Sequence, residues 1–142
     1  MALADFWDRE AKLTAIVVAS GYDGTNVFVS EQPTGVGPEG WHAFGGFSGR
    51  DLDVFVASWL SDPEAEATTF HEIAHVELDH DSDPAYEEAL AADRIAGTEH
   101  YRARWEIDAD ALAAALVESV ADRLTDPAGS LAYLAEDVDR FR

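Results

Sequence analysis

The sequence of 142 residues contains no cysteine. This absence excludes a disulfide framework, a metal site built on thiolates and a cysteine nucleophile. Any bound metal ion must therefore use histidine, aspartate or glutamate side chains. Long apolar runs are also missing: the longest uninterrupted one, Ala111 to Val117, is far shorter than the roughly 20 residues that a membrane-spanning helix needs.

Basic residues are scarce, since nine Lys and Arg oppose 29 Asp and Glu and the formal net charge is -20. Such a negative field repels nucleic-acid phosphates and anionic lipid surfaces, so we expect neither direct nucleic-acid binding nor a membrane partner. Residues Met1 to Glu10 carry no cluster of positive charge, and the apolar run Ala15 to Ala19 is too short for a signal-peptide core. We therefore expect a cytoplasmic protein, and the sequence leaves its oligomeric state open.

The first sixty residues are typical of strands and turns. Leu13 to Ser20 and Asn26 to Ser30 are rich in Val, Ile or Phe and flank the turn signal Gly21 to Gly24, which predicts a hairpin. Gln32 to Gly49 is rich in glycine and predicts a long loop, while Asp51 to Trp59 alternates as a third strand would.

From Pro63 onward the apolar residues follow a helical period, with Asp62 and Pro63 as the start signal of the first helix. The boundaries of the later helices are marked by the pairs Asp83-Pro84 and Asp126-Pro127 and by Gly97. Four helices are predicted: Glu64 to His80, Ala85 to Gly97, Trp105 to Leu124 and Ser130 to Phe141. The expected fold class is α+β, with residues 1–142 forming a single domain in which a small N-terminal sheet of about three strands packs against the helices.

The strongest chemical signal is His71-Glu72-Ile73-Ala74-His75, an HExxH pattern inside the first predicted helix. At this spacing both imidazoles lie on one helical face and can reach one Zn²⁺, and Glu72 lies beside the water that the metal activates, as a general base. At this composition the pattern is expected by chance about 0.016 times, which favours zinc as a cofactor with His71 and His75 as ligands. The alternative is a pair of ordinary surface histidines beside a solvated glutamate.

A catalytic zinc needs a third protein ligand. His80 and Asp81 follow closely, but the pattern that uses position 81 has a glycine at position 78, and this chain has Leu78. Glu106 and Asp110 stand four residues apart on the third predicted helix, as a ligand and a carboxylate that accepts the imidazole N–H would. We predict Glu106 as the ligand and Asp110 behind it.

Both motifs resemble those of the ImmA/IrrE-like metallopeptidases. The run from His71 to His80 is similar to that family's active-site helix, whose motif often continues to a histidine five residues after the second ligand. The run Glu106 to Ala113 is similar to the second motif, with Ala at +3, Asp at +4, an apolar residue at +6 and Ala at +7. The resemblance covers roughly residues 50 to 125 and implies a gluzincin-type zinc peptidase with Glu106 as third ligand and Asp110 as supporting acid.

The sequence departs from the family's pattern at Leu112, where the family usually has Phe. It also has an acid at Asp108, which leaves open whether Glu106 or Asp108 is the ligand. Residues 117–121 and 130–135 show a weaker likeness to the metallopeptidase domain of ArdC-type antirestriction proteins.

The sequence leaves three function classes open. The first is a zinc-dependent endopeptidase that acts on a specific intracellular protein, with its substrate peptide paired to an exposed edge at Asp51 to Trp59. The second is a metal-binding domain without turnover, and the third is an acidic binding module that mimics DNA. Four residues have side chains that can stabilise an oxyanion, and no sequence spacing favours one of them over the others: His42, His100, Tyr101 and Arg102. The predicted loop contains Trp41, Phe44 and Phe47, and it either covers the active-site cleft of the predicted peptidase or packs on the core.

Overall fold

The computed structural model of the chain describes residues 3–30, 45–48 and 53–142. In these ranges it contains five α-helices, two short 3₁₀ turns and one sheet. The helices are α1 (Leu3–Ala19), α2 (Asp62–Glu77), α3 (Pro84–Ala96), α4 (Ala103–Ser119) and α5 (Pro127–Arg140). The strands are β1 (Asn26–Ser30), β2 (Gly45–Ser48) and β3 (Asp53–Ala57). The predicted α+β class with a small three-stranded sheet is confirmed.

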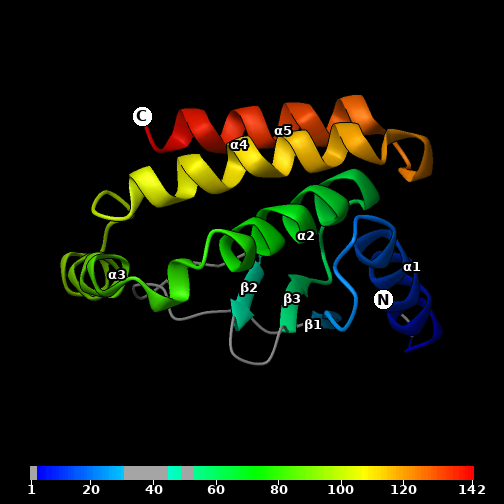
Figure 1. The fold of residues 1–142 in the computed structure, drawn as a ribbon, viewed down its shortest axis with the longest axis horizontal. Helices are drawn as coiled ribbons and strands as arrows, with labels where there is room; N and C mark the ends of the chain where they lie inside the picture. The colour runs from blue at the N-terminus through cyan, green and yellow to red at the C-terminus, as the bar shows by residue number, and fades with distance from the viewer. Residues whose placement is uncertain (1–2, 31–44, 49–52) are drawn as a thin grey trace.

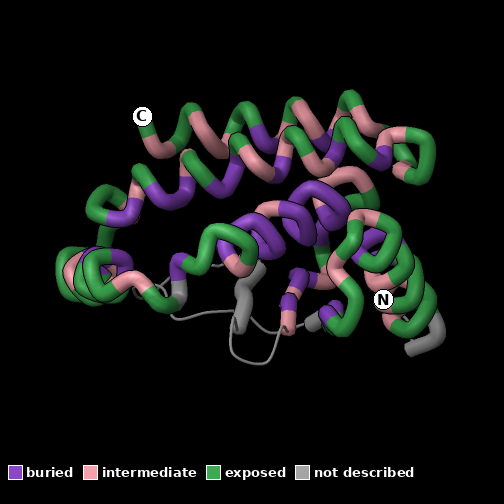
Figure 2. Tube along the Cα trace, in the orientation of Figure 1, coloured by how far each residue is buried: buried purple, intermediate pink, exposed green. Residues whose placement is uncertain are grey.

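Helix α2 occupies the centre of the arrangement. Figure 1 shows the α4–α5 pair along one side of α2 and the sheet on its other side, with α1 beside the sheet. This position explains why α2 is the most continuously buried helix in Figure 2. Its apolar residues Phe70, Ile73 and Ala74 are fully buried, as the helical period predicted, but Leu78 at its end is 41% exposed.

The predicted hairpin between Leu13 to Ser20 and Asn26 to Ser30 is wrong, because the first of these segments is the end of α1. Its β-branched residues suggested a strand, yet Leu13, Ile16 and Val17 follow a helical spacing and are buried against the core. Packing of this face therefore outweighs the local β preference. The predicted turn exists, but it leads from a helix into β1.

The sheet order is β1-β3-β2, which makes β3 the central strand. Strand β3 is parallel to β1, with Asn26 opposite Asp53, and antiparallel to β2, with Phe47 opposite Val54. The expectation that Asp51 to Trp59 forms an exposed edge is therefore wrong, because hydrogen bonds occupy both sides of β3. The predicted loop Gln32 to Gly49 also contains β2, whose glycines gave no strand signal. The rest of that loop, with Trp41 and Phe44, lies outside the described residues.

The helix ends differ by a few residues from the predictions. Ser61, not Asp62, caps α2: its hydroxyl accepts a hydrogen bond from Glu64 N at 3.4 Å, and Glu64 Oε1 accepts one from Ser61 N at 3.0 Å. This reciprocal pair is a capping box, which satisfies two otherwise free N–H groups at the start of the helix.

Replacement Ser61→Ala is expected to lower the free energy of unfolding by about 1 kcal/mol, because it removes the acceptor for a helix-end N–H group. Chemical denaturation monitored by circular dichroism would measure the change. Ser119→Ala is the matched control, since that hydroxyl is exposed and donates only to the Leu116 carbonyl of its own helix. An equal loss in both variants would contradict a specific role for the cap.

The described helices include none that is both long enough and apolar enough to span a membrane.

Candidate metal centre

Three side chains from α2 and α4 converge on one point. His71 Nε2 lies 2.8 Å from Glu106 Oε2, and His75 Nε2 lies 3.1 Å from His71 Nε2 and 3.2 Å from Glu106 Oε2. Ligand atoms in a tetrahedral zinc site stand about 3.3–3.5 Å apart, so a small outward adjustment of these three atoms would admit a metal ion. Two imidazoles and a carboxylate are also a donor set that zinc accepts, and His71, His75 and Glu106 therefore form a group that could hold a metal ion.

The helices can bring these atoms together because their contact is lined by small residues. Four fully buried alanines belong to one core cluster where α2 packs against α4: Ala67, Ala74, Ala109 and Ala113. Alanine side chains let two helices approach closely, and the one-turn spacing of the histidines then presents both rings to the first turn of α4. Glu106 lies in that first turn.

The outer nitrogen of His71 has two carboxylate neighbours. His71 Nδ1 hydrogen-bonds to Asp110 Oδ1 at 2.6 Å, and Asp137 Oδ2 of α5 lies 3.9 Å from the same nitrogen. Asp110 thus contacts the outer nitrogen of His71, and its role as the support of a metal ligand stays a prediction. A carboxylate in this position holds the imidazole with its Nε2 turned toward Glu106 and His75, the orientation that a metal ligand would need. Asp137 had no sequence signal, because it lies far away in the chain and is brought in by the packing of α5.

A second set of buried groups surrounds His75 and Glu106. His75 Nδ1 lies 2.8 Å from His80 Nδ1, and the Tyr86 hydroxyl lies 3.5 Å from Glu106 Oε1. The ring of Tyr86 also lies against His75 and His80. His80 is therefore a neighbour of His75 rather than part of the group of three. Sequence reasoning missed Tyr86, whose proximity depends on where α3 is placed.

A sharp turn after α2 returns His80 toward His75. The turn needs no glycine, because Asp79 itself adopts the left-handed conformation with φ of 56°. Its carboxylate accepts a hydrogen bond from the Ser82 hydroxyl at 2.9 Å, which favours this conformation for an aspartate. The absence of glycine at position 78 therefore did not prevent the reversal of the chain. The side chain of Asp81 lies outside the described part of this turn.

The charges of the cluster are strongly coupled. Burial lowers the pKa of His71, but its hydrogen bonds to Asp110 and Glu106 outweigh this effect and raise that pKa well above its usual value. Burial raises the pKa of Glu106, yet the neighbouring histidines reverse the effect and hold it well below the usual range. For His75, burial dominates and lowers the pKa. In the metal-free cluster both shifts favour a protonated His71 beside an ionised Glu106.

Glu72 is buried beside this cluster, with 6% of its surface exposed. Burial, followed by the opposing charge of His71 and the like charge of Glu106, gives Glu72 a pKa of about 8 in the metal-free protein. A carboxylate in such a place responds strongly to added positive charge, because a cation nearby lowers its pKa.

The remaining predicted site residues separate into distinct environments. Asp108 is exposed, which leaves Glu106 as the residue of that pair that meets the histidines. His100 and Tyr101 are exposed as well, whereas Arg102 is buried with its Nε 3.9 Å from Glu106 Oε1. His42 lies outside the described residues.

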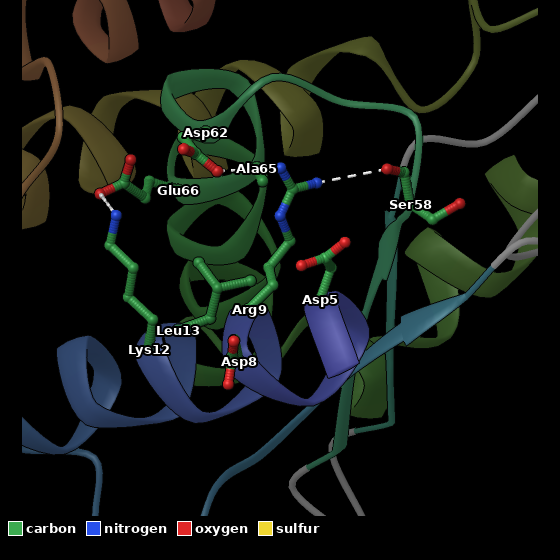
Figure 3. A pocket seen from close by; sticks show the side chains of 9 residues that line it. All are labelled: Asp5, Asp8, Arg9, Lys12, Leu13, Ser58, Asp62, Ala65 and Glu66. Atoms are coloured by element: carbon green, nitrogen blue, oxygen red, sulfur yellow. Dashed lines mark hydrogen bonds and ion pairs between the residues drawn. The ribbon is translucent and has the colours of Figure 1, made fainter. Parts of the chain in front are cut away.

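A separate pocket of about 570 Å³ lies between α1 and the start of α2 (Figure 3). Arg9 lines it and donates to the Leu60 carbonyl at 2.8 Å and to Asp62 Oδ1 at 2.9 Å. Lys12 donates to the Thr125 hydroxyl at 2.6 Å and lies 3.9 Å from the buried Glu66. These contacts connect α1 to α2, to the segment between β3 and α2, and to the chain before α5, which is a structural role.

Comparisons of the chain with protein-family models, curated proteins and solved structures give no match.

Proposed function

We propose that the chain is a zinc-dependent metallopeptidase of the gluzincin type, which hydrolyses a peptide bond in a specific protein or peptide substrate. The observation that carries this proposal is the convergence of His71, His75 and Glu106 within 3.2 Å, with Asp110 behind His71. The order of the HExxH helix, the connecting helix and the glutamate helix adds support, since it also underlies the resemblance to the ImmA/IrrE-like peptidases.

In this proposal His71, His75 and Glu106 hold the metal, and Asp110 keeps His71 oriented through its Nδ1. Zinc, when bound, lowers the pKa of a water molecule toward 7 and polarises a carbonyl group. Glu72 accepts the proton of the attacking water and then donates it to the leaving amide nitrogen. A cation close to Glu72 lowers its pKa from the value of about 8 in the metal-free protein, which leaves its carboxylate ionised and able to accept that proton.

Among the described residues, one edge of the sheet is left for a peptide. At the β1 edge, Glu10 Oε1 already accepts the N–H of Val29 at 2.9 Å, so α1 occupies that side. Strand β2 forms the other edge of the described sheet and packs against α2. We propose that a substrate peptide pairs with β2 through its main chain. Slower amide exchange in Gly45–Ser48 on addition of a peptide would support this pairing, and unchanged exchange would exclude it.

The metal content of purified protein tests the ligand set. Wild type is expected to hold about one zinc per chain by elemental analysis, and Glu106→Ala is expected to lose it, because two histidines alone bind weakly. Asp108→Ala is the matched control, since Asp108 is an exposed acid on the same helix and should leave the zinc in place. Wild type without zinc, or loss of zinc in Asp108→Ala alone, would contradict the proposed site.

A further inference from the structure

A chain of ion pairs runs from the metal centre along α5. His71 Nδ1 lies 3.9 Å from Asp137 Oδ2, and Asp137 Oδ1 lies 3.0 Å from a terminal nitrogen of Arg140. Arg140 Nε in turn lies 3.2 Å from Glu99 Oε2, in the segment between α3 and α4. One arginine therefore bridges two carboxylates that belong to different parts of the fold.

The same chain of ion pairs returns to the centre through Arg102. Glu99 Oε1 lies 3.7 Å from a terminal nitrogen of Arg102, whose Nε lies 3.9 Å from Glu106 Oε1. The backbone N–H of Arg102 donates to the buried Asp93 at 3.1 Å, which anchors the start of α4. The pairs run from His71 through α5 to Glu106. Because His71 Nε2 and Glu106 Oε2 lie 2.8 Å apart, they form a closed ring.

The local charge explains why such a ring is needed. Glu106, Asp110 and Asp137 all lie within 4 Å of His71 ring nitrogens, and like charges at this density repel one another. Arg102 and Arg140 are two of only nine basic residues in the chain, and both lie among these acids. A bridging arginine fixes the geometry of two carboxylates better than lysine does, because its planar head presents several donors in a rigid arrangement.

We propose that Arg140 is a positioning residue of the metal centre, which through Asp137 and Glu99 keeps His71 and Glu106 facing each other, close enough for both to bind one metal ion. This inference rests on the proposed function, because it assumes that these residues bind zinc.

Electrostatics alone predicts the opposite effect from positioning. Removing the positive charge of Arg140 would by itself favour a bound cation and strengthen zinc binding. Loss of positioning would instead weaken zinc binding, because the acids around His71 are free to shift. The sign of the change in zinc affinity therefore separates the two effects, and it does not depend on knowing a substrate.

The experiment compares the zinc dissociation constants of wild type, Arg140→Gln, Arg140→Lys and Arg142→Gln by competition with a chromophoric chelator at fixed pH. Arg142→Gln is the matched control: it removes the same charge two residues further on, from a pair with Asp139 whose side chains are 70% and 76% exposed. We expect Arg140→Gln to bind zinc about tenfold more weakly, the lower end of the effect for residues that orient metal ligands. Arg140→Lys should lie between it and wild type, and Arg142→Gln should match wild type within about twofold.

Thermal unfolding of the metal-free proteins shows whether the variants fold, and Arg140→Lys carries the test if Arg140→Gln does not. Equal or tighter zinc binding in folded Arg140→Gln would overturn the inference, as would equal weakening in Arg142→Gln. Failure of wild type to bind zinc would instead contradict the proposed function itself.

Discussion

Glu72→Gln is expected to lower the rate of peptide hydrolysis by about 10²–10⁴-fold, the usual contribution of a general base, while the protein keeps its zinc. Glutamine has nearly the shape of glutamate but cannot accept the proton of the attacking water. The metal group remains intact, since His71, His75 and Glu106 are unchanged. Cleavage would be followed by mass spectrometry on a proteolytic peptide library, with zinc content measured on the same samples.

Glu77→Gln is the matched control for this variant, because Glu77 is an exposed glutamate at the end of the same helix. Wild-type cleavage rates in Glu72→Gln at full zinc content would exclude Glu72 as the base. If zinc-loaded wild type cleaves no peptide of the library and Glu72→Gln behaves identically, a metal-binding domain without turnover becomes the better assignment of function.

Zinc is expected to stabilise the folded protein by about 4 kcal/mol when free zinc exceeds its dissociation constant about a thousandfold. The native state brings His71, His75 and Glu106 together, whereas the unfolded chain separates the two helices that carry them. Denaturant unfolding in the presence of zinc, and again after addition of a chelator, would measure the difference.

His75→Ala should abolish this stabilisation, while His100→Ala should preserve it, because His100 is an exposed histidine that does not belong to the group of His71, His75 and Glu106. Zinc that stabilised His75→Ala as much as wild type would be bound elsewhere, for example by the many surface carboxylates.

The zinc-linked stabilisation is also expected to depend on pH. Asp110 and Glu106 raise the pKa of His71 well above 6.5 in the metal-free protein, in spite of its burial. Zinc binding must therefore release the proton of His71, and the stabilisation should grow as the pH rises and fall as the pH is lowered. Titration of zinc-linked stability across neutral pH would test the sign, and a stabilisation independent of pH would contradict proton displacement at His71.

The main parts of the proposed centre could be predicted because they are local patterns. His71 and His75 stand one helical turn apart, and Glu106 and Asp110 repeat that spacing, so the sequence alone places each pair on one helix face. The absence of cysteine already restricted any metal site to such residues. The α+β class followed in the same way, since four predicted helices and two of the strands depend on periodicity and on Pro and Gly signals close in the chain.

The failures concern contacts between distant segments. Ile16 and Val17 have high β preference, yet they lie in α1 because their spacing lets that helix bury them against the sheet and α2. Strand β2 has almost no local signal, and it exists through its pairing with β3. The same pairing makes β3 central, which a search for strands along the sequence could not show.

The sequence by itself determined which residue types could bind a metal and which of them share a helix face, because helical spacing is a property of neighbouring residues. Only the tertiary structure decided that Glu106 and not Asp108 meets the histidines, since this depends on which side of α4 faces α2. It also placed Asp137 beside His71 and Tyr86 beside Glu106. These contacts arise from the packing of α5 and α3 against the centre, and packing between distant segments leaves no periodic signal in the chain.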